Sequence, residues 1–283
     1  MIAGTPLESY SLTREGTLAD ETRTATENAA HQLAFLRQYA GDPARYGAPA
    51  PHPDVRRAGV TGSPHFLNLV AEARIACRPW IDRVEGKAVT FLDGSSADFD
   101  AIIIGTGFRL HLPYLSEEIA AIVEADDISI MLADFTFYPE LDGLGFIGLW
   151  PLMGPYLVPL EQQARYLAYT WGGAIPPRTK EQLAGALEEC RVRNPHLGYQ
   201  RQNDMAIKFA RLAGTDPGGR VDSEIEALIE QNAVTGMTFR LVGVDAMAGA
   251  VDVIKREAAR YGRPPVTDAG IPFTEPPLRR RPG

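Results

Sequence analysis

An unbroken run of apolar residues near the middle of the chain is its clearest pattern. Ala101–Ile104 carry apolar side chains at successive positions, so both faces of an extended strand here would be apolar. Such a run is typical of a strand that is buried on both sides. The run ends at Gly105-Thr106-Gly107, and in open α/β sheets ligands bind beyond this end of a strand. The pattern predicts a buried strand that begins at Asp100 and stops at Gly105-Thr106-Gly107, although glycine also ends strands that bind nothing.

A second apolar run is followed by a helical pattern. Leu144–Trp150 predict another buried strand, Pro151–Pro159 predict a rigid loop, and a helix is expected from about Leu160. This order brings the N–H groups of a helix start to the end of a strand, where they suit an anion or an electron-rich ring edge. A purely structural strand–helix unit is the alternative. The expected apolar face of the helix consists of Ala164, Leu167, Ala168 and Trp171.

Capping and turn residues predict the remaining elements. Thr24 and Glu27 form a capping box before a helix that Gly41 would end. Two glycine-containing turns predict a β-hairpin over residues 84–94. The other predictions are a helix over His65–Ala73, a strand over Arg74–Cys77, and helices after Thr179, after Ser223 and over Asp245–Tyr261.

One glycine motif is rejected as a dinucleotide site. Gly143–Gly148 fits the pattern G-x-G-x-x-G. This pattern binds pyrophosphate only where it follows a strand and opens a helix. Here the glycines lie before and within an apolar run, and Pro151 follows them. The sequence contains no other match to the pattern.

Composition and charge exclude several classes of function. The chain has 283 residues, of which 45% are hydrophobic and 23% are charged, and its formal net charge is −8. The acidic balance argues against general binding to nucleic acid or to an anionic membrane. No apolar run reaches the roughly 18 to 20 residues that span a membrane. The first residues do not have the pattern of a signal peptide, so we expect a cytoplasmic protein.

The cysteines and histidines predict no redox or metal centre. Cys77 and Cys190 are far apart and form no C-x-x-C motif, which disfavours a redox dithiol or a zinc knuckle. The five histidines show no spacing that is typical of metal ligands. We therefore expect no metal site, and the catalytic residues stay unknown.

Three segments resemble, in order, motifs of the flavin-containing monooxygenase family. Asp100–Arg109 resembles the motif D-x-[IV]-[IV]-x-A-T-G-[YF], with Gly105 in place of the usual alanine. The second segment consists of Phe146–Leu149, Gly154 and Glu161–Arg165, and it resembles F-[IV]-G-L … G … E-x-Q-A-R. The third segment, Phe239–Gly243, resembles Y-R-L-x-G-P.

The resemblance implies an α/β fold, namely part of a flavoprotein fold with two dinucleotide-binding domains, followed by carboxyl-terminal helices. Residues 1–98 would be a remnant of the NADP-binding domain with its β-hairpin. Residues 99–283 would be the carboxyl-terminal part of the FAD-binding domain with a helical extension and a loose tail. For Arg109, contact with a pyrophosphate and an ordinary surface position both stay open. The residues that the matching motifs place near the cofactor are Gly105, Thr106, Gly107, Phe108, Arg109, Leu157, Val158 and Gln163.

The resemblance also implies a chemistry: NADPH- and O2-dependent oxygenation of a small soft nucleophile, with FAD and NADPH as cofactors. The family's glycine-rich dinucleotide motifs are absent from the sequence. We therefore interpret the chain as a truncated enzyme, or as one half of a split enzyme that an amino-terminal half would complete. One alternative is an inactive, cofactor-free remnant or interaction module. Another is a nicotinamide–disulfide reductase relative, which the lack of a redox cysteine pair disfavours.

Two physical expectations follow from the missing motifs. Without a glycine-rich phosphate cradle, the isolated chain should bind FAD weakly. A sheet without its neighbouring strands exposes an unpaired edge and apolar surface, so the chain should also self-associate.

Overall fold

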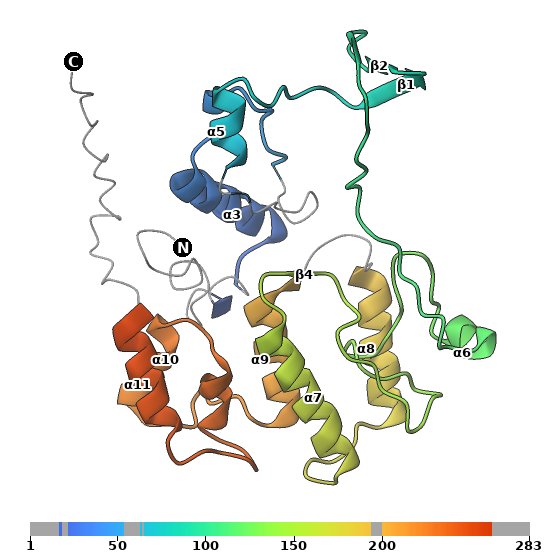
Figure 1. Cartoon of the computed structure of the whole chain (residues 1–283). Coiled ribbons are helices and arrows are strands. Elements are labelled where there is room, and N and C mark those ends of the chain that lie inside the picture. Colours follow the sequence, from blue (N-terminus) through green and yellow to red (C-terminus); the bar gives the residue numbers. More distant parts are fainter. Residues whose placement is uncertain (1–16, 19–21, 54–62, 64, 194–199, 262–283) are drawn as a thin grey trace. The chain divides into compact units, whose positions relative to one another are not determined.

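The computed structural model describes residues 17–18, 22–53, 63, 65–193 and 200–261. These residues form helices and short strands, in agreement with the predicted α/β class (Figure 1). The predicted dinucleotide-binding domains and their boundary stay a prediction. The chain divides into two compact units, which are described separately: residues 22–209, and residues 1–21 together with 210–283.

The first unit contains most of the secondary structure. Its helices are α3 (Ala25–Ala40), η1 (Pro43–Tyr46), α5 (Phe66–Ala71), α6 (Glu117–Ile122), α7 (Leu157–Trp171), α8 (Lys180–Arg193) and most of α9 (Gln202–Ala213). Its strands are β1 (Ile81–Glu85), β2 (Ala88–Phe91), β3 (Ser96–Asp98), β4 (Leu152–Met153) and β5 (Gln200–Arg201).

The predicted capping box is confirmed at the start of α3. The Glu27 N–H donates to Thr24 Oγ1 at 3.3 Å, and the Thr24 N–H donates to Glu27 Oε2 at 2.8 Å. Gly41 follows the helix with a φ of 82°, and its N–H donates to the Arg37 carbonyl at 3.0 Å. The Thr24 and Glu27 side chains therefore determine the start of this helix, and the backbone of Gly41 determines its end.

The predicted hairpin is confirmed and has a third strand. Strands β1, β2 and β3 form an antiparallel sheet in that order, in which Val84 faces Val89. Gly86 and Gly94 lie in the two turns with φ of 63° and 80°, a conformation that glycine adopts without strain. The parallel pair β4–β5 has only two residues in each strand.

The predicted strand over Arg74–Cys77 is wrong. The N–H groups of Arg74 and Ile75 both donate to the Leu69 carbonyl, at 2.9 and 3.2 Å, and so close the end of α5. A chain that turns back onto a helix end cannot continue as a strand. The short helix predicted just before it is confirmed as α5.

The predicted strand from Asp100 to Gly105-Thr106-Gly107 is also wrong. Residues 101–108, here called the apolar segment, form no strand, and each of them is exposed. Ile103 is 95% exposed and Ile104 is 78% exposed. The pattern describes side chains that fit a buried strand, whereas the described residues provide no neighbouring strand for it.

The run Leu144–Trp150 is irregular rather than a strand. Its N–H groups donate to different parts of the chain and not to one neighbouring strand. The Phe146 N–H donates to the Thr136 carbonyl at 2.8 Å, and the Gly148 N–H donates to Gln163 Oε1 of α7 at 2.9 Å. Gly148 also has a φ of 77°, which interrupts an extended backbone. The rejected glycine motif thus lies in irregular backbone.

Helix α7 is confirmed, but its buried face differs from the predicted one. Leu167 is buried, whereas Ala164, Ala168 and Trp171 are exposed. The buried side chains of this helix include three large polar ones. Arg165 Nη1 donates to Gln162 Oε1 at 2.7 Å, and the bonds of Gln163 are described below. Apolar spacing could not reveal this face, because a polar side chain can be buried when its hydrogen bonds are satisfied. The buried residues are Pro159, Gln162, Gln163, Arg165, Tyr166 and Leu167.

Helices α8 and α9 contribute apolar faces to the first unit. The predicted helix after Thr179 is confirmed as α8, and its residues Ala186 and Leu187 pack in one cluster with Ala133. Helix α9 was not predicted, although several of its apolar residues recur at helical spacing. The rings of its Phe209 and of Trp150 lie 5.3 Å apart between centroids.

The second unit contains α10 (Ser223–Gln231), η3 (Gly236–Arg240) and α11 (Ala250–Tyr261). Both predicted helices are confirmed, with shifted starts. Asp222 caps α10, since its Oδ1 accepts the Ile225 N–H at 3.0 Å. The helix predicted from Asp245 begins at Ala250, and Asp245 pairs with Arg240 instead.

Candidate functional site

The amino terminus of α7 is the part of the predicted site that can receive a ligand. Leu157 and Val158 form its first turn, where N–H groups have no acceptor within the helix. No described side chain caps this turn, and Pro159 contributes no N–H group. Leu157 is 80% exposed. Two outward N–H groups at the positive end of a helix suit an electron-rich ring edge or an anion.

The loop before α7 is fixed by close contacts. Tyr156 Oη accepts a hydrogen bond from the Leu152 N–H at 3.2 Å. Gly154 has a φ of 109°, and a Cβ at this position would lie 3.3 Å from the Gln202 side chain. Glycine is therefore required here both for its backbone conformation and for space.

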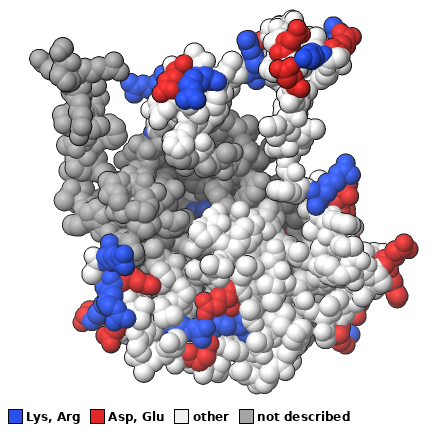
Figure 2. Space-filling view, in the orientation of Figure 1, with Lys and Arg blue, Asp and Glu red and all other residues white. Residues whose placement is uncertain are grey.

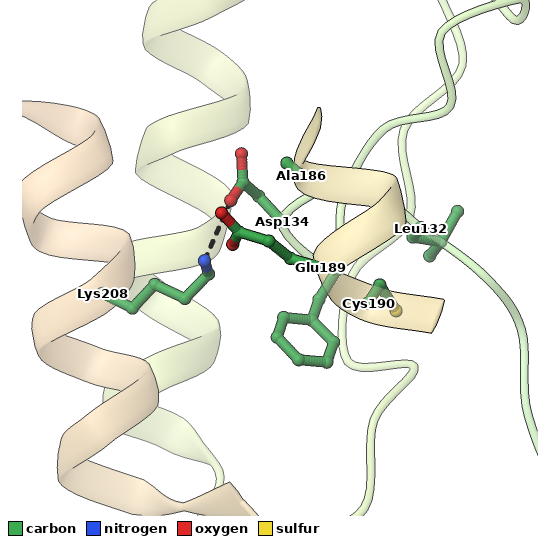
Figure 3. A pocket seen from close by; sticks show the side chains of 7 residues that line it. Leu132, Asp134, Ala186, Glu189, Cys190 and Lys208 are labelled. Carbon is green, nitrogen blue, oxygen red and sulfur yellow. Dashed lines mark hydrogen bonds and ion pairs between the residues drawn. The ribbon is translucent and has the colours of Figure 1, made fainter. Parts of the chain in front are cut away.

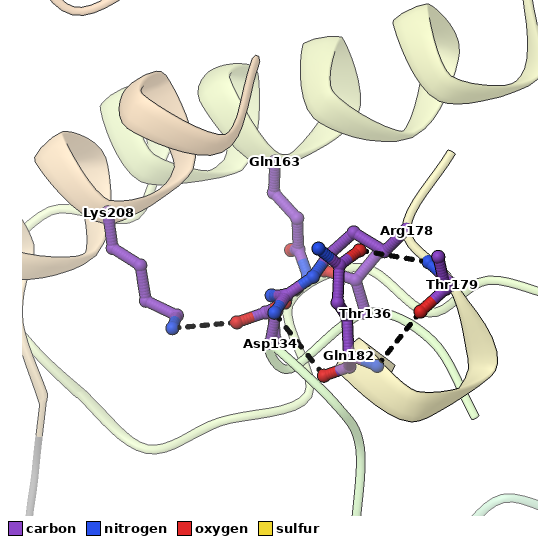
Figure 4. Close-up of polar contacts among 7 residues, drawn as sticks. All are labelled: Asp134, Thr136, Gln163, Arg178, Thr179, Gln182 and Lys208. Carbon is purple, nitrogen blue, oxygen red and sulfur yellow. Dashed lines mark hydrogen bonds and ion pairs between the residues drawn. The ribbon is translucent and has the colours of Figure 1, made fainter. Parts of the chain in front are cut away.

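Gln163, also predicted near the cofactor, is fully buried and holds loops together (Figure 4). Its Nε2 donates to the Phe135 carbonyl at 2.8 Å, to Thr136 Oγ1 at 3.0 Å and to the Phe146 carbonyl at 3.1 Å. Its Oε1 accepts the Gly148 N–H at 2.9 Å. Both donor hydrogens and the acceptor are in use, so a cofactor contact through this amide would require an internal bond to break.

The other predicted residues lie on the exposed part of the chain. Gly105, Thr106, Gly107 and Phe108 belong to the apolar segment, and a Cβ at either glycine would meet nothing within 4 Å. Arg109 is exposed, and its Nη1 donates to Asp127 Oδ2 at 2.9 Å. The structure thus groups Leu157, Val158 and Gln163 on one helix. Among the described residues, none forms a cradle around residues 105–109.

Sequence reasoning missed a buried charged cluster beside Gln163. The Asp134 side chain is buried and accepts bonds from Arg178, which lies before α8, and from Lys208 Nζ of α9 at 2.9 Å (Figure 4). These three residues are here called the Asp134 cluster. The only signal in the sequence is a single aspartate within the apolar run 130–135. Its partners are 44 and 74 residues away, a separation that no local pattern reveals.

The backbone at the Asp134 cluster is unusual. Asp134 and Phe135 have φ of 49° and 57°, in the left-handed region. Aspartate tolerates this region better than most residues, whereas phenylalanine is strained there. The bonds of Asp134 and the bond from Gln163 to the Phe135 carbonyl hold this turn in place.

Tyr166 of α7 remains neutral at ordinary pH. Burial raises the pKa of its hydroxyl well above the usual value, the charge of Asp134 raises the pKa further, and Arg178 lowers it. A phenol that keeps its proton cannot act as a base near neutral pH. We therefore assign Tyr166 no acid–base role.

A small hollow beside the Asp134 cluster is not a cofactor site (Figure 3). Its volume of about 10 Å³ leaves room for about one water molecule. Neither a flavin nor a substrate fits such a space. The lining residues are Leu132, Asp134, Phe135, Ala186, Glu189, Cys190 and Lys208.

The described surface adds little evidence for other ligands. On the face shown in Figure 2, basic and acidic side chains lie close to one another in small groups. Within the described ranges, no three histidine, cysteine, aspartate or glutamate side chains gather as they would around a metal. No helix in this part of the chain is long and apolar enough to cross a membrane.

The described residues fit a flavin in part. The first turn of α7 can bind the electron-rich edge of a flavin ring through the N–H groups of Leu157 and Val158. A cradle for the pyrophosphate would need a glycine-rich loop at a helix start, and Gly105 and Gly107 do not lie at one. The described residues therefore offer N–H donors for a ring edge and no cradle for a pyrophosphate.

Comparisons with known proteins indicate the family of the chain. The model of the flavin-binding monooxygenase-like family matches residues 63–208, just over half of the chain. A 4-hydroxybenzoate brominase (decarboxylating) from Marinomonas mediterranea is 31% identical over 134 residues, which are 46% of this chain and 24% of the relative. A brominase of the same description from Pseudoalteromonas luteoviolacea is 37% identical over 112 residues, which are 38% of this chain and 20% of the relative.

The matched regions cover only a quarter or less of each curated relative, but they cover a large part of this chain. The family match extends from α5 to α9 and includes the apolar segment, the Asp134 cluster and α7. The chain therefore belongs to the flavin-binding monooxygenase-like family.

Proposed function

We propose that the chain is part of a flavin-dependent monooxygenase that uses FAD and NADPH. The family match over residues 63–208 carries this proposal. In the proposed reaction, NADPH, a proton and O2 react with a small soft nucleophile to give NADP⁺, water and the oxygenated product. The flavin supplies the redox chemistry when it is bound, and the protein supplies binding, orientation and exclusion of water.

The residues of α7 have separate roles in this proposal. The N–H groups of Leu157 and Val158 bind the pyrimidine edge of the flavin, where negative charge gathers on reduction. Gln163 does not contact the flavin in this proposal. Its side chain bonds to the Gly148 N–H and the Phe135 carbonyl and so holds these loops against α7. Residues Gly105–Arg109 approach the cofactor only when further protein covers the apolar segment.

The dinucleotide-binding elements of the enzyme lie outside this sequence. The curated relatives are about four and five times as long as their matched regions, which are 24% and 20% of their lengths. We propose that such elements, on the same polypeptide or on a separate amino-terminal half, complete the site and bind the FAD pyrophosphate and NADPH. The chain alone should therefore bind FAD weakly.

An absorbance spectrum tests the flavin proposal. The purified chain is incubated with excess FAD, with and without a polypeptide that carries the dinucleotide-binding motifs, and is then desalted. We expect flavin bands near roughly 370 and 450 nm only in the combined sample, together with NADPH consumption. A combined sample that stays colourless would support the inactive remnant instead.

The names of the relatives favour a second candidate function. Both are brominases of 4-hydroxybenzoate, so a phenolic substrate and halide oxidation are an alternative to simple oxygenation. The same reconstituted sample distinguishes the two. Brominated product from a phenol in the presence of bromide would favour the halogenase, and oxygenated product from a sulfide or amine would favour the monooxygenase.

A further inference from the structure

The parallel strands β4 and β5 bring the starts of two helices to one edge. In this pair, Met153 lies beside Arg201. β5 continues directly into α9 at Gln202, and residues 154–156 lead from β4 into α7. In α/β proteins, ligands bind beyond the carboxyl ends of parallel strands. Gln202 therefore lies at the same edge as the loop that opens α7, the part of the candidate site that can receive a ligand.

The Gln202 side chain packs against this loop. Gln202 is only 5% exposed. Its Cβ and its Oε1 each lie 3.3 Å from the position that a Cβ of Gly154 would occupy. A larger residue at position 154 would therefore press against the amide. The buried amide of Gln202 is thus directed at the residue with which the approach to α7 begins.

The Gln202 amide makes no hydrogen bond within the described part of the chain. Its Oε1 is buried and no described residue donates to it. Its Nε2 makes no bond to a described residue either. Gln163 shows the opposite case, because all of its amide groups are in use. A buried carboxamide without partners lowers the stability of a fold, so such a group calls for a partner of another kind.

The first turn of α7 and the Gln202 amide together define the chemistry of this partner. The N–H groups of Leu157 and Val158 can only donate, whereas a carboxamide has an acceptor and a donor side by side. An anion would bind to the helix start, but it has no N–H group for Gln202 Oε1. A cyclic imide has C=O, N–H and C=O in a row, so its edge pairs with both groups at once. The pyrimidine ring of a flavin ends in this edge.

We propose that Gln202 is a second binding residue for the flavin ring, beside the first turn of α7. The inference rests on the proposed function and adds a contact to it. Leu157 and Val158 would donate to the ring carbonyl C2=O. Gln202 would accept the ring N3–H at Oε1 and donate from Nε2 to C4=O. Rotation about the last bond of the side chain, which is broad for glutamine, would turn the amide from Gly154 to the ring edge while the loop stays in place.

Nitrogen-15 NMR of the full chain tests this contact. The probes are flavin mononucleotide (FMN) and its 3-methyl derivative, which has the same phosphate but no N3–H. The Gln202 side-chain signal is the one that Gln202→Met removes from the spectrum. We expect FMN to shift this signal together with the Leu157 and Val158 amides. We also expect FMN to bind roughly tenfold more tightly than 3-methyl-FMN, because one hydrogen bond is worth about this factor.

The variant Gln202→Met separates a binding role from a structural one. It keeps the length of the side chain and removes the unpartnered amide. We expect roughly tenfold weaker FMN binding and no remaining preference over 3-methyl-FMN. The urea midpoint should stay the same or rise, since an apolar group replaces a buried polar group without partners. The control is Gln182→Met at the start of α8, which should bind FMN like the unmodified chain.

The outcomes separate this contact from the proposed function. Shifts of the Leu157 and Val158 amides without a change at Gln202 would overturn the inference and leave the flavin proposal standing. Equal affinity for FMN and 3-methyl-FMN would also overturn it. So would a lower urea midpoint of Gln202→Met, which would show that the amide has partners in the fold. If no signal at either helix start responds to FMN, the inference fails, and retained flavin in the reconstituted sample decides the proposed function separately.

Discussion

Two regions of the first unit place their side chains in opposite surroundings. Gln163 and the Asp134 cluster are polar and buried, and bonds within the chain satisfy the Gln163 amide and both Asp134 oxygens. The apolar segment is exposed and makes no hydrogen bond to any described residue. The comparison teaches that burial follows the availability of partners rather than the polarity of a residue. Residues of the chain itself satisfy the first region, whereas no described residue bonds to the second.

The largest effect should come from removing the bonds of Gln163. Gln163→Met keeps the length of the side chain and removes this partner from the buried Phe146 carbonyl and from the part-buried Phe135 carbonyl and Gly148 N–H. We expect a loss of about 3 kcal/mol in the free energy of unfolding, since each orphaned group costs about 1 kcal/mol or more. Urea titration measures this loss.

A second glutamine provides the control for this variant. Gln182 takes part in the exposed capping box of α8, where its N–H donates to Thr179 Oγ1 at 3.2 Å and its Oε1 accepts the Thr179 N–H at 3.0 Å. Its carbonyl accepts a bond from Arg178 Nη2 at 3.3 Å, which a change of the side chain leaves in place. Gln182→Met should cost about 1 kcal/mol or less, because capping bonds at the surface are worth little more. Equal losses at both positions would contradict the internal role of Gln163.

The next effect concerns the charge of the Asp134 cluster. Asp134→Asn keeps the shape of the side chain, and asparagine also tolerates the left-handed backbone at this position. The substitution removes the negative charge that pairs with Lys208 and Arg178. We expect a loss of about 2 kcal/mol, because breaking a largely buried ion pair exposes the remaining charges to desolvation. Asp127→Asn, which breaks an exposed pair, should cost about 0.5 kcal/mol. A smaller loss for Asp134→Asn than for Asp127→Asn would refute the assignment.

A smaller change in stability should distinguish Gly145, which is packed against α7, from Gly105 of the apolar segment. A Cβ at Gly145 would lie 2.5 Å from Leu167 Cδ1, so Gly145→Ala must displace a flexible side chain and should cost about 1 kcal/mol. A Cβ at Gly105 would meet nothing within 4 Å, so Gly105→Ala should leave the unfolding midpoint unchanged. A destabilised Gly105→Ala variant would show that the apolar segment is packed.

The smallest effect is a pH dependence at α3. Bonds from the Thr24 side chain and backbone lower the pKa of the exposed Glu27 carboxyl. A lowered pKa means that the carboxylate stabilises the fold above its ordinary pKa of about 4.3, and that this contribution is lost as the pH falls through the lowered value. In Thr24→Ala, an NMR titration should show the Glu27 pKa moving up toward the ordinary value. An unchanged pKa would exclude the side-chain bond.

The sequence predicted elements whose causes are local. The capping box of Thr24, the hairpin turns at Gly86 and Gly94, and helix α7 all depend on residues within a few positions of one another. The family was also identified from short motifs, and the match over residues 63–208 confirms it.

The errors arise where distant residues decide the outcome. The buried face of α7 contains Gln163, whose partners lie 15 to 28 residues away, so apolar spacing selected the wrong face. Asp134 was missed for the same reason. The strand pattern at Ile102–Ile104 correctly describes what these side chains favour, but strand formation also needs a neighbouring strand that the described chain does not supply.

Hydrogen exchange of the chain alone tests the central contrast most directly. The account predicts that the amides of residues 101–108 exchange at nearly the rate of an unstructured peptide, while the Phe146 and Gly148 amides, which are bonded to Thr136 and Gln163, are strongly protected. Protection of the apolar segment in the monomeric chain, equal to that of Gly148, would contradict the account.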